Sequence, residues 1–179
     1  MKIASWNVNS LKVRLPQVLD WINLNQPDVL CLQETKQNND NFPHDVFEKR
    51  GLFSYHNGQN TYNGVAIISN KELIDVQFDI PNFYDEQKRL ISGIYPNDED
   101  PKFRVISAYI PNGQSLNSDK FEYKMNWLKS FINFLQTKID GIENIITGDF
   151  NIAPSTLDCY DTKSWDGKIL VSPQEREYF

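Results

Sequence analysis

The sequence predicts a single layered α/β domain over residues 1–179, with helices outside and sheets inside. Three observations support this prediction. Strand-like apolar runs alternate with a few segments of amphipathic helical pattern. No internal repeat, low-complexity stretch or linker divides the chain. A chain of 179 residues is long enough to bury a sizeable core without disulfides or a structural metal.

The first elements are predicted as strand, helix and strand. Lys2–Val8 alternates well enough for a strand, and Val13–Asn25 carries apolar residues at helical spacing. Pro16 is expected in the first turn of that helix, where a missing N–H costs little. Asp28–Gln33 is a short apolar strand that ends at Glu34.

A short helix over Pro43–Arg50, closed by Gly51, leads into a run of strands. The strand candidates are Leu52–His56, Gly64–Ser69, Leu73–Phe78, Arg89–Tyr95 and Phe103–Ile110. Because they follow one another closely, we expect antiparallel meanders rather than regular βαβ units.

The remaining elements are a long helix, a strand and a terminal helix start. The helix spans Ser118–Ile139, and Asn144–Thr147 reads as a buried strand that ends at Gly148–Asp149. The apolar stripe of the helix consists of Phe121, Met125, Leu128, Phe131, Ile132 and Leu135.

The segment Ser172–Glu175 is a capping box with Pro173 at the first helical position. It predicts a helix from Pro173, yet the sequence stops at Phe179, whereas helices average about 11–12 residues. We therefore expect the chain to be truncated at its C-terminus. A short, frayed terminal helix is the alternative.

Composition narrows the class of protein. The net charge of −6 and the pI of about 4.9 argue against a general nucleic-acid coat protein. They are compatible with an enzyme that collects carboxylates around Mg²⁺. Cys31 and Cys159 form no disulfide framework or metal pattern, and Cys31 is expected to be a small buried hydrophobe. No signal peptide or membrane span is predicted, so the expected location is the cytoplasm.

Polar side chains follow several apolar strands: Asn7, Glu34, Tyr109, Asp149 and Asn151. Strand ends are where a rigid scaffold best presents functional groups. Taken singly, each has an ordinary interpretation as a turn residue or a half-buried aromatic. Taken together, they predict one shared site.

The motifs around these residues occur in the order WNVNSLKVR, LQETK, AYIPNG and GDFNIAP. Together they resemble the exonuclease III family of the endonuclease/exonuclease/phosphatase superfamily. The resemblance extends over the whole chain, including NGVAIIS, QKRLISGIY and the tail from LDCYD onward. It implies a DNase I-like, four-layer α/β sandwich of two mixed sheets flanked by helices, incomplete at the C-terminus.

The resemblance also implies roles for the polar residues. Glu34 is the main ligand of Mg²⁺, for which Mn²⁺ is a substitute. Asn7 supports the metal and its water shell, and Asp149 and Asn151 also lie around the metal. Asp149 is the acid/base group that activates the attacking water. Asn151 donates a hydrogen bond to a phosphate oxygen, and Tyr109 contacts the phosphate or assists the leaving group.

The implied substrate is double-stranded DNA with an abasic site or a 3′ end, cleaved by a monomer in base-excision repair. Arg89 is a weaker candidate for contact with the DNA backbone, and a solvated strand residue is the alternative. Two family motifs are not found: an aspartate in an arginine–isoleucine–aspartate context and a serine–aspartate–histidine. His44 and His56 are expected to be solvated and do not replace them.

The chain is therefore expected to be impaired as a nuclease, with only the N-terminal portion of the domain. Two alternatives stay open. One is an inactive remnant that retains metal or DNA binding. The other is a different phosphoesterase of the same superfamily, acting on lipid or nucleotide. The balance of abasic endonuclease against 3′ exonuclease activity is not determined by these motifs.

Overall fold

A computed structural model describes residues 1–96, 103–137 and 142–179. Its contacts divide the chain into two compact units. The first unit contains Met1–Tyr109 and strand β8 (Glu143–Asp149), and the second contains Ile110–Thr137 and Phe150–Phe179. The expectation of one domain over residues 1–179 stays a prediction.

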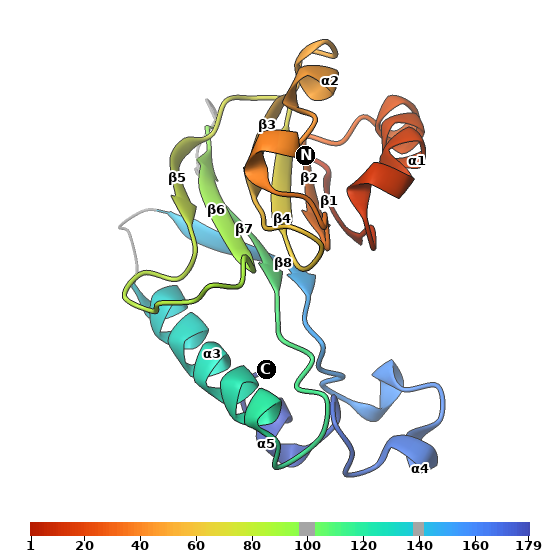
Figure 1. The fold of residues 1–179 in the computed structure, drawn as a ribbon, viewed down its shortest axis with the longest axis vertical. Coiled ribbons are helices and arrows are strands. Elements are labelled where there is room, and N and C mark those ends of the chain that lie inside the picture. The colour runs from red at the N-terminus through yellow and green to blue at the C-terminus, as the bar shows by residue number, and fades with distance from the viewer. Residues whose placement is uncertain (97–102, 138–141) are drawn as a thin grey trace. The chain divides into compact units, whose positions relative to one another are not determined.

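The first unit contains two four-stranded sheets, both mixed, as the resemblance implies (Figure 1). Sheet A has the order β1-β2-β4-β3, formed by β1 (Ile3–Asn7), β2 (Val29–Gln33), β4 (Val65–Ser69) and β3 (Phe53–Asn57). Sheet B has the order β5-β6-β7-β8, formed by β5 (Ile74–Phe78), β6 (Leu90–Tyr95), β7 (Phe103–Tyr109) and β8.

Most neighbouring strands are antiparallel, as the short connections predict, but two pairs are parallel. β1 pairs in parallel with β2, and β7 pairs in parallel with β8. The segments that connect these pairs carry helices α1 and α3, so both connections are long enough for a crossover. The expectation of antiparallel meanders is confirmed for the strands that it concerned, since β3–β4, β5–β6 and β6–β7 are all antiparallel pairs.

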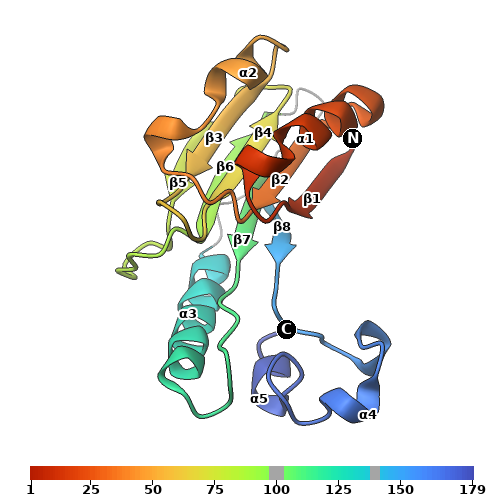
Figure 2. The ribbon, with the colours of Figure 1, turned by 45° about the vertical axis from the view of Figure 1, so that its right-hand side comes forward.

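Alternating side chains of sheet A build two cores. Leu30, Leu32 and Ile68 point to one face and pack against Leu11, Val18 and Ile22 of α1 (Leu11–Asn25). Val29, Cys31 and Ile67 point to the other face and pack against Ile91 and Val105 of sheet B. Figure 2 shows the resulting layers, with α1 and α2 (His44–Glu48) outside sheet A. Cys31 is buried, as expected.

Helix α1 begins two residues earlier than its apolar spacing predicts. Pro16 consequently lies inside the helix rather than in its first turn, and the helix forgoes one backbone hydrogen bond there. Gln26 ends it in the left-handed conformation, and its N–H donates to the carbonyl of Ile22. The short 3₁₀ helix η1 (Asn39–Asn41) precedes α2.

In the second unit, α3 (Asp119–Gln136) is capped by the hydroxyl of Ser118. The predicted end at Ile139 lies outside the described residues. Helix α3 buries Phe121, Leu128 and Phe131 of the predicted stripe, together with Lys124 and Trp127, which the stripe did not include. The predicted members Met125, Ile132 and Leu135 are only partly buried.

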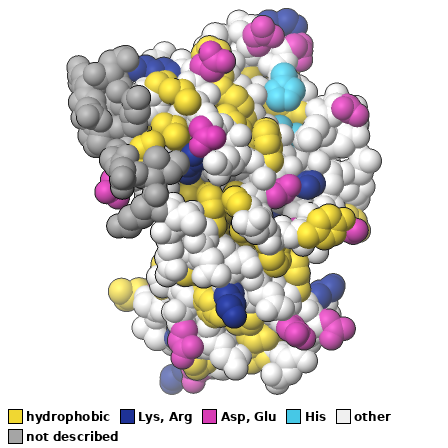
Figure 3. Space-filling model, turned by 90° about the vertical axis from the view of Figure 1, so that its left-hand side faces the viewer, with side chains coloured by type: hydrophobic (Ala, Val, Ile, Leu, Met, Phe, Trp, Pro, Cys, Tyr) yellow, Lys and Arg dark blue, Asp and Glu magenta, His cyan; other side chains and the backbone are white. Residues whose placement is uncertain are grey.

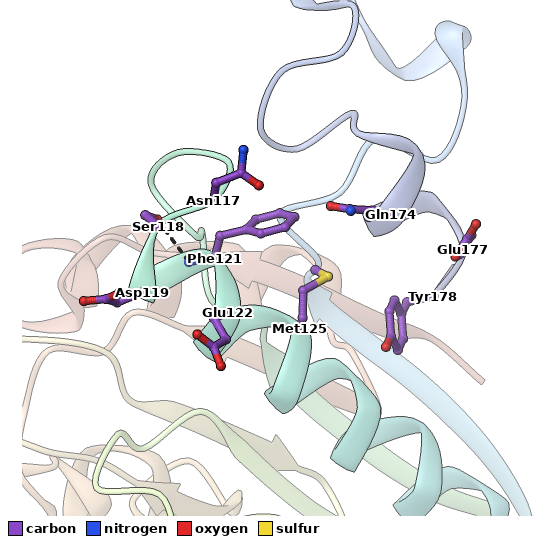
Figure 4. A pocket seen from close by; sticks show the side chains of 9 residues that line it. All are labelled: Asn117, Ser118, Asp119, Phe121, Glu122, Met125, Gln174, Glu177 and Tyr178. Atoms are coloured by element: carbon purple, nitrogen blue, oxygen red, sulfur yellow. Dashed lines mark hydrogen bonds between the residues drawn. The ribbon is translucent and has the colours of Figure 1, made fainter.

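The rest of the second unit contains η2 (Thr156–Asp158), α4 (Thr162–Trp165) and α5 (Pro173–Arg176). Ser172 and Glu175 form the predicted capping box at the start of α5. A hollow of about 470 Å³ lies between the first turns of α3 and the segment from Gln174 to Tyr178 (Figure 4). Its lining includes none of the polar strand-end residues singled out in the sequence.

Strand β8 is less buried than predicted, since Ile146 is 38% exposed at the edge of sheet B. Within the described ranges, no helix is both long and apolar enough to cross a membrane.

Candidate active site

Four of the predicted polar residues lie at the carboxyl ends of the parallel strand pairs in the first unit. Asn7 ends β1 and Glu34 follows β2, while Tyr109 ends β7 and Asp149 ends β8. Tyr109 and Asp149 are paired in the register of sheet B. Because β1 contacts β8, the ends of both parallel pairs meet in one place.

The side-chain amide of Asn7 connects the two carboxylates. Its Nδ2 donates to Glu34 Oε1 at 2.9 Å and to Asp149 Oδ2 at 2.8 Å. The other atom of this amide, Oδ1, accepts the backbone N–H of Asn9 at 3.0 Å, which fixes the orientation of the group. One amide therefore holds two acidic side chains close to each other, although like charges repel.

Glu34 is surrounded by donors. Tyr109 donates its hydroxyl to Oε1 at 3.0 Å, and Lys36 forms an ion pair with Oε2 at 3.0 Å. Partial burial acts to raise the pKa of Glu34, but hydrogen bonds from Asn7, Lys36 and Tyr109 outweigh it and lower the pKa below its ordinary value. Glu34 is thus held as a carboxylate.

Arg89 forms a cation–π contact with Tyr109, because its guanidinium lies 4.7 Å from the centre of the tyrosine ring. Arg89 also donates to the carbonyl oxygen of Tyr109 at 3.1 Å and to the side chain of Gln87. Burial and the charge of Glu34 raise the pKa of Tyr109 to about 12. The solvated interpretation of Arg89 is wrong, because only 8% of this residue is exposed.

The turn that presents Glu34 has an unusual backbone. Glu34 and Lys36 both have φ of 54°, and Thr35 between them is fully buried. The hydroxyl of Thr35 lies 2.8 Å from Nε2 of His56, and its N–H donates to the carbonyl of Gly64. Two tertiary contacts thus hold a strained turn in place.

His56 does not have the solvated position expected from the polar letters around it. It is 5% exposed, and its ring stacks on Phe42 at 4.1 Å. Burial, followed by the nearby His44, lowers the pKa of His56 to about 3, so the ring is neutral. His44 itself lies on the exposed surface, as expected.

Asp149 follows Gly148, whose backbone approaches β7 closely. A Cβ on Gly148 would lie 1.9 Å from the carbonyl oxygen of Ala108, and its φ is +149°. Only glycine fits there without displacement of a strand. The glycine of the GDFN motif therefore determines where Asp149 lies.

Asn151, the fifth predicted residue, belongs to the second unit. Its Nδ2 donates to the carbonyl of Ile110 at 2.9 Å, and its Oδ1 accepts from Asn112 at 3.3 Å. Its own backbone has φ of 47°. The structure thus brings together Asn7, Glu34, Tyr109 and Asp149, while Asn151 follows two residues later in the chain.

The donor set of the site fits a hard divalent cation. Glu34 and Asp149 offer carboxylate oxygens that share one amide donor, and Mg²⁺ is commonly held by one or two carboxylates plus water. Across the described residues, no group of three or more His, Cys, Asp or Glu side chains is arranged to hold a metal.

Some residues of the site were not singled out in the sequence. Lys36 belongs to the LQETK motif, and its charge three positions after the end of β2 at Gln33 was the available signal. No local signal indicates the Thr35–His56 contact, because it joins residues 21 positions apart.

The chain belongs to the endonuclease/exonuclease/phosphatase family, whose profile matches residues 4–173. Within this family its relatives are of the exonuclease III kind, as the four motifs indicated. It is 34% identical to exodeoxyribonuclease III of Haemophilus influenzae, over 100% of this chain and 70% of that protein. It is 30% identical to the DNA repair nuclease APEX1 of Danio rerio, of which it covers 58%.

Solved structures agree with this assignment and with the DNase I-like fold. The 3′-5′ exonuclease NExo of Neisseria meningitidis is 42% identical, with a TM-score of 0.94 over 100% of this chain and 69% of that one. An AP endonuclease from Archaeoglobus fulgidus is 33% identical, with a TM-score of 0.91 over 99% of this chain and 68% of that one.

Proposed function

We propose that this protein hydrolyses phosphodiester bonds of DNA in base-excision repair, with Mg²⁺ as cofactor. The observation that carries the proposal is the Asn7 amide that joins Glu34 to Asp149. The names of the relatives, which include an exodeoxyribonuclease, a DNA repair nuclease and an AP endonuclease, support a DNA repair nuclease.

The chemical problem is that the negative charge of the phosphodiester disfavours attack by an activated, partly anionic water. Bound Mg²⁺ supplies charge neutralisation and a Lewis acid. Glu34 is poised to hold it, because this side chain is kept ionised by three donors. Mn²⁺ is the proposed substitute. Lys36 forms an ion pair with the other carboxylate oxygen, Oε2 of Glu34.

The remaining residues act on water and phosphate. Asp149 accepts the proton of the attacking water, and Asn7 orients its carboxylate. Tyr109 keeps its proton at physiological pH and donates a hydrogen bond to the phosphate or the leaving oxygen. Asn151 donates to a phosphate oxygen as negative charge builds.

Charge on the surface is compatible with this proposal but does not carry it. On the face drawn in Figure 3, acidic side chains are interspersed with basic ones, and the described residues of that face form no continuous basic band. The net charge is −6. Affinity for DNA is therefore expected to depend strongly on the metal and weakly on a general basic surface.

The test is cleavage of a duplex with one abasic site by residues 1–179, purified away from host nucleases. The enzyme is used in excess over DNA, so that a single turnover is detected. Cleavage should require Mg²⁺ and should fall on the order of 10²-fold or more in Asp149→Asn. Equal rates for the wild type and Asp149→Asn would overturn the proposal.

Parallel substrates separate the alternatives. A duplex with a recessed 3′ end and one with a 3′-phosphate are included, because NExo is described as a 3′-5′ exonuclease and as a 3′ phosphatase. Phosphoinositide and sphingomyelin test the other phosphoesterases of the superfamily. Metal binding without any cleavage would favour the inactive remnant.

The impairment expected from the sequence is part of the proposal. This chain spans 70% of the Haemophilus enzyme, so its rate is expected to be about 10²–10³ below that of this relative, assayed side by side. A rate near that of the relative would show that residues within 1–179 suffice. Monomeric state and cytoplasmic location are proposed with it.

A further inference from the structure

A buried ion pair in the second unit joins two helices that are far apart in the sequence. Lys124 of α3 and Glu175 of α5 are both 0% exposed, and Lys124 Nζ lies 2.5 Å from Glu175 Oε1. Charged side chains are almost never fully buried unless they are paired. The pair is therefore a built feature of the unit and not an accidental surface contact.

The ammonium of Lys124 makes two further bonds, both to backbone carbonyls. It donates to the carbonyl of Asn151 at 2.7 Å and to that of Asn112 at 3.3 Å. Together with Glu175, these acceptors match the three donors of an ammonium. Lys124 thus holds the segment after β8 and the segment after β7 at a fixed spacing.

The side chains of the two asparagines depend on this spacing. The amide of Asn112 donates to Oδ1 of Asn151 at 3.3 Å, and Nδ2 of Asn151 donates to the carbonyl of Ile110. The backbone of Asn151 has φ of 47°, a conformation that needs tertiary support. Lys124 donates a hydrogen bond to the carbonyl of this same residue.

Glu175 is fixed independently of Lys124. Its Oε2 accepts the N–H and the hydroxyl of Ser172, and its Oε1 accepts the N–H of Leu170. These bonds fix the position of the carboxylate, and the carboxylate in turn determines where the ammonium of Lys124 lies.

We infer that Lys124 is a positioning residue for Asn151: it sets the orientation of the Asn151 amide through the two carbonyls, with Glu175 as its anchor. The inference deepens the proposed function and rests on it, because Asn151 is the proposed donor to the phosphate. Lys124 is not a catalytic residue, since its three acceptors occupy it away from any substrate.

The test removes the charge pair as a unit. Lys124→Met alone leaves Glu175 buried without its partner, so the variant is Lys124→Met/Glu175→Gln, in which glutamine retains an acceptor for the capping box. Glu175→Gln alone is the intermediate variant, because it removes the anchoring charge but leaves the Lys124 side chain next to both carbonyls. The exposed Asn133 on α3 provides an internal reference.

The first readout is the side-chain amide signal of Asn151 in a ¹⁵N spectrum, assigned by its loss in Asn151→Ala. It should shift in the double variant and shift less in Glu175→Gln, while the Asn133 signal stays in both. An unshifted Asn151 amide in a folded double variant overturns the inference. This readout needs no activity, so it decides the role of Lys124 even where the nuclease proposal fails.

The second readout is cleavage of abasic duplex. The double variant should lose about 10–100-fold in kcat, with little change in KM, because a small displacement of a positioned group costs up to about that much. In an Asn151→Ala background the same change should cost nothing further. Full additivity of the two losses would mean that Lys124 does not act through Asn151.

A wild-type measurement covers the case in which the double variant does not fold. The ammonium protons of Lys124 should exchange slowly with water and be visible in a ¹H–¹⁵N spectrum of lysine side chains. Fast exchange would show that the ammonium is not held by the carbonyls and would overturn the inference.

Discussion

Asn7 and Asp149 are 142 positions apart in the sequence, yet the amide Nδ2 of Asn7 donates to Oδ2 of Asp149 at 2.8 Å. The same nitrogen donates to Glu34 at 2.9 Å. A neutral donor between two carboxylates offsets part of their repulsion, but it does not neutralise either charge. A cation at the same place would relieve the repulsion further.

Mg²⁺ should therefore stabilise the protein through Glu34. At a concentration ten times the dissociation constant, binding to the folded state adds about 1.4 kcal/mol, which raises the thermal midpoint by about 3–6 °C. Glu34→Gln should abolish most of this rise, as measured by differential scanning fluorimetry. Asp45→Asn is the control, because Asp45 is an exposed carboxylate paired with Lys49. An equal rise in the wild type and Glu34→Gln would argue against Glu34 as the ligand.

Removal of the bridging amide should destabilise the metal-free protein. Asn7→Ala deletes two hydrogen bonds to carboxylates and leaves the acids facing each other, so the free energy of unfolding should fall by about 2–4 kcal/mol. Urea unfolding measures this loss, and added Mg²⁺ should recover part of it. Asn133→Ala on the exposed face of α3 should change stability by less than about 0.5 kcal/mol. A loss in Asn7→Ala that Mg²⁺ leaves unchanged would contradict the account of repulsion.

His56 should make the stability depend on pH below neutrality. Its pKa is about 3 in the folded protein and near 6.5 when unfolded, so the unfolded chain binds more protons between these values. Stability is thus fully present above pH 6.5 and falls as the pH drops, by about 2 kcal/mol at pH 5. The measurement is urea unfolding at pH 7 and pH 5.

His56→Gln removes the titrating ring and is expected to flatten this dependence, although it lowers stability at every pH. Carboxylates with a lowered pKa, such as Asp28, act only at more acidic pH and remain in the variant. The same slope in both proteins would assign the effect to other groups.

Gly148→Ala should be costly because its Cβ would lie 1.9 Å from the carbonyl oxygen of Ala108. We expect a loss of about 3 kcal/mol in the free energy of unfolding, from overpacking and backbone strain together. Gly51→Ala is the matched comparison. Gly51 also has a positive φ, but nothing lies within 4 Å of its Cβ, so only strain of about 1 kcal/mol applies. Equal losses of unfolding free energy in the two variants would show that the close approach of β7 to β8 does not exclude a side chain at position 148.

The sequence predicted local features better than distant ones. Every strand was found within a few residues of its bounds, and the Ser172–Glu175 capping box and the burial of Cys31 were confirmed. These depend on residues close in the sequence or on their own hydrophobicity. The strand ends also predicted that Glu34 and Asp149 would meet.

Features that depend on distant partners were missed. The burial of Lys124 was not predicted from the helical pattern, because its partner, Glu175, lies 51 positions away. The polar neighbours of His56 in the sequence predict a solvated ring, whereas its burial comes from contacts with Phe42 and Thr35. The partners of the two parallel strand pairs were not predicted from the local pattern, because each pair joins strands that are separated by a helix.

The bond between Asn7 and Asp149 also has a consequence for the order of events on the ribosome. Asn7 and Glu34 leave the exit tunnel early, but Asp149 follows Asn7 by 142 residues. At about 5–20 residues per second, Asp149 is synthesised roughly 7 to 28 s after Asn7. Strands β1 and β2 can pair meanwhile, while β8, the last strand of sheet B, is still being translated. The nascent chain thus carries no assembled pair of acids until Asp149 has been made.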